Sequence, residues 1–190
     1  MAEAHAFGFN DSTRRLPDEA ESRIPPAAQI GDSLAVGSSA IGQGRVLATP
    51  LEMATVAATI ADRGVRARPR LLATLPVSLS RVTSPQIAGE VRAMMLAVVR
   101  EGTATSVQIP GVQIAAKTGT AELHGGLNEE DGTTAPSDPQ NDDAWIVAFP
   151  AVSNPNLAVA VMLVGAGAGG TSAAPIARAL LQSALSEPIA

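Results

Sequence analysis

The chain has no cysteine and no tyrosine, and aromatic residues make up only 2% of its 190 residues. The lack of cysteine excludes a disulfide framework and a thiolate site. Because the few aromatics cannot fill a core, the core must consist of alanine, valine, leucine and isoleucine, which need close packing. Hydrophobic residues nevertheless reach 46% and charged residues 16%, as is typical of a globular domain and not of a disordered chain.

Positive charge is also scarce. The net charge of −5 and the isoelectric point near 5.0 argue against nucleic acid or an anionic membrane surface as a main partner. The first residues lack the basic and apolar regions of a signal peptide. The longest uncharged run, 144–177, is interrupted by prolines, asparagines and glycines before it reaches the length of a membrane span. The chain as given is therefore expected to be soluble.

Helical signals occur at three places. Threonine at an N-cap followed by proline predicts a helix that begins at Thr49-Pro50 and stops at Gly64, and Ser84-Pro85 predicts a second that runs to Gly102. A third helix is expected over 173–184. Residues at helical spacing are predicted to form the buried faces of the first two helices: Met53, Val56, Ala57, Ile60, Ile87, Val91, Met94, Met95 and Val98.

Three strands are expected in the second half of the chain. They are 112–123, which is rich in valine, isoleucine and threonine, "AWIVAFPAV" at 144–152 and "NLAVAVMLVGA" at 156–166. The acidic segment 124–143 between the first two reads as an exposed loop. We therefore expect an α+β fold with a partial antiparallel sheet of about three strands flanked by helices. The chain divides into a polar segment with a Gly-Gln-Gly loop (1–45), a helical part (46–111) and the strands with the last helix (112–190).

The only lysine of the chain lies in the first of these strands, in "AAKTGTAE". On its own, Lys117-Thr118-Gly119-Thr120 is compatible with an edge-strand lysine between solvent-facing threonines. The four residues also resemble the third motif of the penicillin-binding proteins and serine β-lactamases. Two features around it strengthen the resemblance: the segment "AIGQGRVLATPLEMATVAATIADRG" and the order of helices, motif strand and "AWIVAFPA". Residues 5–185 resemble the C-terminal part of the transpeptidase domain of class B penicillin-binding proteins.

The resemblance implies the β-lactamase-like fold and a serine D,D-transpeptidase that cross-links peptidoglycan stem peptides and binds β-lactams. In such a site Lys117 supplies positive charge for the substrate carboxylate and for proton transfer, and the hydroxyls of Thr118 and Thr120 bond that carboxylate. Gly119 permits close approach of the substrate, and the Thr120 N–H is an oxyanion donor. Lys117 and Thr120 are thus the catalytic candidates, with Thr118, Gly119 and Thr120 as substrate-binding residues. No cofactor or metal is implied.

The sequence departs from the family in two motifs. With a single lysine, Ser-x-x-Lys cannot occur, and none of the fourteen serines precedes asparagine by two positions as Ser-x-Asn requires. Ser137-Asp138-Pro139 is rejected because it follows the Lys-Thr-Gly motif. The chain is thus expected to be a C-terminal half that is inactive alone and whose partner is the N-terminal half of the domain. The alternative is a non-catalytic binding or structural module. In the intact family the domain works outside the cytoplasmic membrane on an anchor not found in this sequence.

Several other features are given structural interpretations. Gly165–Gly170 matches G-x-G-x-x-G, but only 20 residues follow, so a flexible strand-to-helix turn is preferred to a dinucleotide site. His5 and His124 are expected at the surface, Ser38 and Ser39 in a loop without a catalytic role, and Trp145 as a packing anchor. The methionines expected in the core are Met53, Met94, Met95 and Met162.

The last predicted strand, 157–165, is apolar on both faces, as a central strand would be. In the family its neighbour on one side comes from the N-terminal half. An unpaired edge without proline or charge is a template for pairing with another chain. We therefore expect self-association through this edge.

Overall fold

The computed structural model describes residues 2–11, 16, 19–123, 139–152 and 156–186. Its helices are α1 (Ala2–Phe7), α2 (Ala27–Ile30), α3 (Ser33–Ala40), α4 (Pro50–Ala61), α5 (Pro85–Glu101) and α6 (Ala173–Ser186), with short 3-10 turns η1 (Thr105–Val107) and η2 (Pro139–Asn141). Its strands are β1 (Val65–Ala67), β2 (Leu79–Arg81), β3 (Ile114–Glu122), β4 (Asp142–Pro150) and β5 (Val159–Leu163). None of the described helices has the length and hydropathy needed to cross a membrane.

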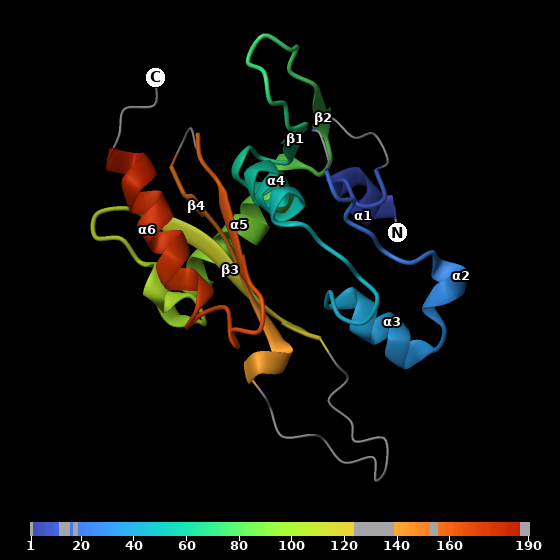
Figure 1. Ribbon diagram of the computed structural model, residues 1–190. Coiled ribbons are helices and arrows are strands. Elements are labelled where there is room, and N and C mark those ends of the chain that lie inside the picture. The colour runs from blue at the N-terminus through green and yellow to red at the C-terminus, as the bar shows by residue number, and fades with distance from the viewer. Residues whose placement is uncertain (1, 12–15, 17–18, 124–138, 153–155, 187–190) are drawn as a thin grey trace.

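The larger sheet is antiparallel with the order β3-β4-β5, which confirms the predicted α+β class and three-strand sheet. β3 pairs with β4 over nine residues, from Ile114 opposite Pro150 to Glu122 opposite Asp142. Helix α6 covers one face of this sheet, and α4 and α5 lie on the other (Figure 1). The sheet is therefore the middle layer between two helical layers.

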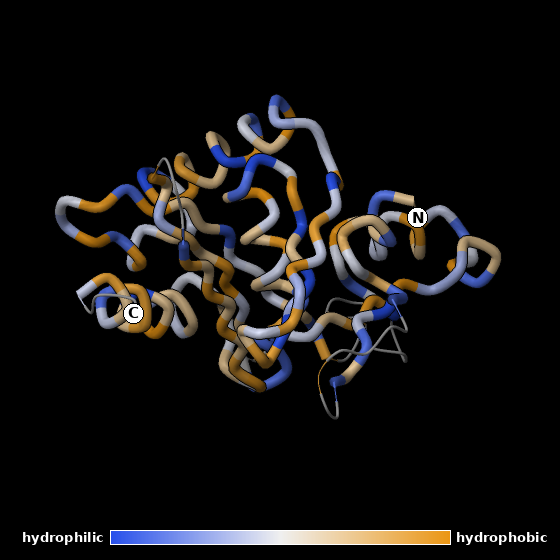
Figure 2. The backbone as a smooth tube through the Cα atoms, turned by 90° about the horizontal axis from the view of Figure 1, so that it is seen from above, coloured by the Kyte–Doolittle hydropathy of each residue, from blue (hydrophilic) through white to orange (hydrophobic). Residues whose placement is uncertain are grey.

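The core consists of small residues, as the composition requires. Seen from above, apolar and polar stretches alternate along the chain (Figure 2). β5 and most of β4 are apolar, whereas in β3 the apolar run is limited to the first three residues. Phe149 is the only aromatic side chain among the fully buried ones of the described residues. Among the described residues, eight alanines in or beside the sheet have 0% exposure: Ala104, Ala115, Ala116, Ala144, Ala148, Ala173, Ala174 and Ala177. Small side chains let the helices pack close to the strands.

The two long predicted helices begin where their caps indicate. The Thr49 hydroxyl accepts the N–H of Glu52 at 3.1 Å, and the Ser84 hydroxyl accepts that of Ile87 at 3.1 Å. Their buried faces differ in part from the prediction. In α4 the buried residues include Thr55 and Thr59, and the hydroxyl of each donates to the carbonyl of the residue four before it, so that neither buried hydroxyl is left without a partner. Met53 and Val56 are only partly buried.

Other predictions are corrected. In α5, Met94 is 61% exposed and Ile87 51% exposed, because the helix packs through another face, on which Ala88, Met95 and Val99 are buried and the predicted Val91 and Val98 are partly buried against the core. Residues 46–111 are not purely helical, since β1 and β2 form a hairpin there. Ser38 and Ser39 lie in α3, not in a loop. β4 begins at Asp142, so the predicted loop 124–143 ends earlier; its residues 124–138, with His124 and the rejected Ser137, lie outside the described part.

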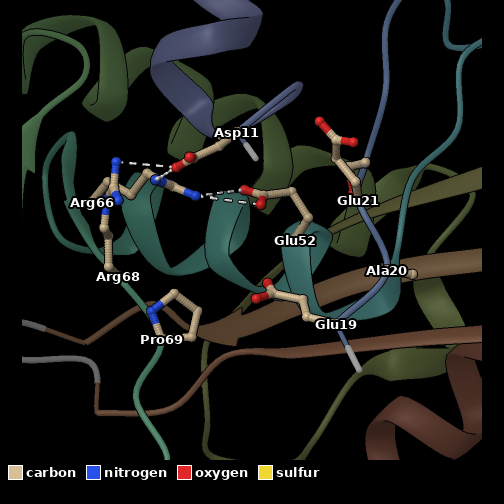
Figure 3. A pocket seen from close by; sticks show the side chains of 10 residues that line it. Asp11, Glu19, Ala20, Glu21, Glu52, Arg66, Arg68 and Pro69 are labelled. Carbon is tan, nitrogen blue, oxygen red and sulfur yellow. Dashed lines mark hydrogen bonds and ion pairs between the residues drawn. The ribbon is translucent and has the colours of Figure 1, made fainter. Parts of the chain in front are cut away.

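A buried ion-pair cluster joins the N-terminal segment to α4 and β1. Arg66, whose side chain is 7% exposed, lies 3.2 Å from the Glu52 carboxylate and 4.0 Å from that of Asp11, and Arg68 reaches Asp11 at 3.1 Å (Figure 3). Ser22 ties the same segment to the start of α4, because its hydroxyl accepts the Thr49 N–H. Residues far apart in sequence are thus held together beside α4.

The first prediction concerns Glu52. Burial raises the pKa of its carboxyl above the ordinary value of 4.5, although the Arg66 guanidinium acts in the opposite direction. The folded state therefore holds this proton more tightly than the unfolded chain, so the contribution of Glu52 to stability falls as pH rises from about 4.5 through the raised pKa. Glu52→Gln cannot titrate, and its stability relative to the wild type should increase between pH 4 and pH 7. Urea unfolding at both pH values measures this, and a relative decrease contradicts it.

The second prediction concerns β5. It forms one edge of the sheet within the described part of the chain, and only its middle residue, Val161, is buried. Its five residues carry neither a charge nor a proline to prevent pairing with another strand. We expect the 190-residue chain to self-associate through this edge, as seen by light scattering after size exclusion. A monomer at tens of micromolar with slow amide exchange throughout β5 would show that the edge is covered within the chain.

Candidate active site

The Lys-Thr-Gly-Thr motif occupies the middle of β3. The first three residues of the strand are buried, whereas Lys117 and Thr120 are exposed and Thr118 and Gly119 are half-buried. In the described sheet β3 pairs only with β4, so its other edge carries no strand. The motif lies at an open sheet edge.

The four motif residues are divided between the two faces of the sheet. Ala116 packs in the core cluster that includes α6, and alternation along the strand places Thr118 and Thr120 on the same face. Lys117 and Gly119 lie on the opposite face, toward α4 and α5. A ligand could therefore contact side chains from both faces only at the open edge of β3, where the backbone is accessible.

Two side chains of the motif have defined partners. The Lys117 ammonium donates a hydrogen bond to the carbonyl of Thr118 at 2.7 Å, and Lys117 takes part in none of the ion pairs of the described residues. The hydroxyls of Thr118 and Thr103 lie 2.6 Å apart. Thr103, two residues after the end of α5, lies beside the motif, and no local sequence pattern singles it out. Its hydroxyl fixes the orientation of the Thr118 side chain.

The open edge of β3 presents backbone groups of alternate residues. The side chain of Gln43, from the Gly-Gln-Gly segment, donates to the carbonyl of Thr120 at 3.0 Å and accepts the N–H of Glu122 at 3.2 Å. In an antiparallel strand each residue directs its N–H and its C=O to the same side. Thr118 and Thr120 therefore also direct both groups outward. A cation and outward N–H groups along one edge suit an extended peptide that carries a carboxylate.

The glycine-rich turn before α6 supports the motif from behind. A Cβ added to Gly169 would lie 2.0 Å from the Trp145 carbonyl oxygen and 2.6 Å from that of Gly119. The turn is also bonded at Gly165, whose N–H donates to the Asp143 carboxylate at 3.0 Å. Residues 165–170 do form the predicted strand-to-helix turn, but it is anchored on the sheet. Trp145 lies opposite Gly119 on β4 and is half-buried.

An antiparallel sheet between helices, with a Lys-Thr-Gly strand at its open edge, is the arrangement of the penicillin-recognising serine transpeptidases that the sequence resembles. The family model "Penicillin binding protein transpeptidase domain" matches residues 1–182. The chain belongs to this family.

Similarity to individual proteins agrees with the family. Peptidoglycan D,D-transpeptidase PbpA of Mycolicibacterium smegmatis is 39% identical over 98% of this chain, and MrdA of Haemophilus influenzae is 30% identical over 95%. The structure of penicillin-binding protein A from M. tuberculosis as a ceftriaxone acyl-enzyme complex matches 97% of this chain with a TM-score of 0.80 and 36% identity. The chain spans only one-third to two-fifths of the length of these proteins: 39% of PbpA, 32% of MrdA and 42% of the solved chain.

The third prediction tests the close approach of Gly169 to β3 and β4. Gly169→Ala places a methyl group on two backbone oxygens that cannot move without breaking the sheet. We expect a loss of more than about 2 kcal/mol of unfolding free energy, as is usual for overpacking. The matched control is Gly89→Ala in α5, where nothing lies within 4 Å of the new Cβ and the helix should gain about 0.5–1 kcal/mol. Equal effects of the two substitutions in denaturant titrations would contradict the packing account.

Proposed function

We propose that this chain forms the Lys-Thr-Gly wall of a serine D,D-transpeptidase site that binds peptidoglycan stem peptides and β-lactams. The observation that carries the proposal is the open edge of β3, which presents the Lys117 ammonium beside the outward backbone groups of Thr118 and Thr120 in a member of the penicillin-binding transpeptidase family. Relatives trapped as β-lactam acyl-enzymes support it.

The proposed chemistry assigns a role to each group. The stem peptide lies along β3 with the carbonyl of its penultimate residue at the Thr120 N–H. A serine attacks this carbonyl, the developing oxyanion is stabilised by that N–H, and the terminal residue leaves with its carboxylate. In antiparallel pairing the chain then continues toward Lys117 and Thr118, so the terminal carboxylate arrives beside the ammonium and the hydroxyl. The direction of the strand and the position of the cation thus fit one substrate orientation.

Gly119 has two roles in this proposal. A Cβ there would lie 3.1 Å from the Cβ of Trp145, so glycine relieves crowding with the opposite strand. It also keeps the surface beside Lys117 free for the substrate. Thr118 is oriented by Thr103, which leaves Thr120 as the motif threonine with an exposed side chain.

The nucleophile and its base must come from another segment, because no serine of these residues is followed three positions later by lysine. An unactivated serine hydroxyl is a poor nucleophile near neutral pH. We place the site on the extracytoplasmic side of the membrane, where peptidoglycan is cross-linked in the family.

The fourth prediction uses a chimera in which this chain replaces the matching residues of M. smegmatis PbpA. The chimera should form a stoichiometric adduct with penicillin, detected by intact mass, whereas the 190-residue chain alone should show none. Lys117→Ala in the chimera should slow acylation about 10- to 100-fold, because a charge-assisted hydrogen bond to the ligand carboxylate is lost. Stability should hardly change.

The control is Arg100→Ala, which removes another exposed cation, located on α5 away from β3. An unchanged acylation rate in Lys117→Ala would exclude Lys117 from the site. A chimera that folds but is not acylated would favour the alternative of a non-catalytic module.

A further inference from the structure

The Gly-Gln-Gly segment forms a defined turn at the end of α3. The N–H of Gln43 donates to the Ser38 carbonyl at 2.9 Å, and that of Gly42 donates to the Ser39 carbonyl at 3.1 Å. These two bonds, with Gly42 at φ 82°, constitute a Schellman motif. Gly44 also has a positive φ, of 71°, so Gln43 is placed between two left-handed residues. The two glycines thus fix the backbone from which the Gln43 side chain extends.

That side chain ends on the candidate site, 77 residues further along the chain. Its amide is bonded to Thr120 and to Glu122, with its Nε2 on one carbonyl and its Oε1 on one N–H. It occupies the backbone groups that the next residues of a paired strand would use. No strand lies on this edge in the described sheet. At Thr120 and Glu122, the Gln43 side chain makes the hydrogen bonds that a neighbouring strand would make.

The two bonds differ in what they leave available. A carbonyl oxygen has two lone pairs, so the Thr120 carbonyl can accept a bond from a ligand N–H in addition to that from Gln43. A backbone N–H has a single hydrogen, so the Glu122 N–H is fully used. The edge therefore remains competent for pairing at Thr120 and is closed at Glu122.

We propose that Gln43 is a register stop that prevents a peptide on β3 from shifting toward Glu122. This rests on the proposed function, in which the carbonyl opposite Thr120 is the one attacked. Because outward groups recur at every second residue, a peptide displaced by two residues toward Glu122 would pair equally well and place its penultimate carbonyl at the Glu122 N–H instead of the Thr120 N–H. With Glu122 closed, pairing is confined to Thr120 and the edge toward Lys117, and the upstream part of the peptide leaves the strand.

Amide hydrogen exchange of the 190-residue chain tests the contact itself. In the wild type, the Glu122 amide should exchange slower than the open Thr120 amide, and Gln43→Ala should accelerate exchange at Glu122 about tenfold or more. Gly119 and Ala121, whose N–H groups face β4, serve as internal controls and should be unchanged. Gln43→Glu keeps an acceptor for the Glu122 N–H and should retain its protection. Equal exchange at Thr120 and Glu122 in the wild type would overturn the proposal.

Peptide binding tests the register. The probes are N-acetyl-D-Ala-D-Ala and diacetyl-L-Lys-D-Ala-D-Ala; only the second has a carbonyl that would reach the Glu122 N–H when its penultimate residue lies opposite Thr120. NMR titration measures the ratio of the two dissociation constants in each protein. Relative to the wild type, this ratio should shift about 2- to 10-fold in favour of the longer peptide in Gln43→Ala, because one backbone hydrogen bond is added. The control variant Gln86→Ala, on the exposed face of α5, should keep the wild-type ratio.

The outcomes separate the two proposals. Binding at β3 with the same ratio in Gln43→Ala and in the wild type would overturn the register stop and leave the proposed function standing. If the longer peptide displaces Gln43 from the Glu122 N–H in the wild type, the register stop is likewise overturned and the proposed function stands. If neither peptide perturbs any amide of β3 in either protein, the proposed function fails, and the stop fails with it.

Discussion

The candidate site depends on the close approach of three backbones: those of β3, β4 and the turn before α6. Gly169 lies so near the carbonyl oxygens of Gly119 and Trp145 that no side chain fits there. β3 is therefore fixed from behind by the turn and from one side by its nine-residue ladder to β4. Only its outer edge is left free. A binding edge held by regular elements keeps its donors in position before a ligand arrives, which is what stabilisation of a developing charge requires.

The scarcity of aromatic residues follows from the same constraint. Layers that approach this closely have room for methyl groups and little more, and the fully buried positions around β3 and β4 are mostly alanine. At the start of α6, Ala173, Ala174 and Ala177 are all 0% exposed, and Leu181 is the one large side chain of the helix buried to the same degree. A core of small side chains is sensitive to changes in side-chain volume, because it has few flexible side chains that can rearrange.

Features that arise from neighbouring residues were predictable from the sequence. The caps Thr49 and Ser84 and the alternation of β3 depend on local groups only, and Lys117 stood out as the single lysine of the chain. Features that depend on distant contacts were not. Met94 has helical spacing but no partner element over it, and α3 was hidden by its glycine and serine content although Asp32 caps it. The contacts of Gln43 with β3 and of Thr103 with Thr118 exist only once the chain has folded.

A strand that binds a peptide by its edge has to remain unpaired and yet avoid pairing with every other strand. β3 meets both demands along a short length. Its outward edge is flanked by the charges of Lys117 and Glu122, and the amide of Gln43 bonds the Thr120 carbonyl and occupies the Glu122 N–H, so that only the edge from Thr120 toward Lys117 remains open to pairing. β5, at the opposite edge, has no such protection. In the proposed function the two edges therefore differ: β3 takes part in a brief and selective pairing with a peptide, whereas β5 has the character of a strand that another strand covers.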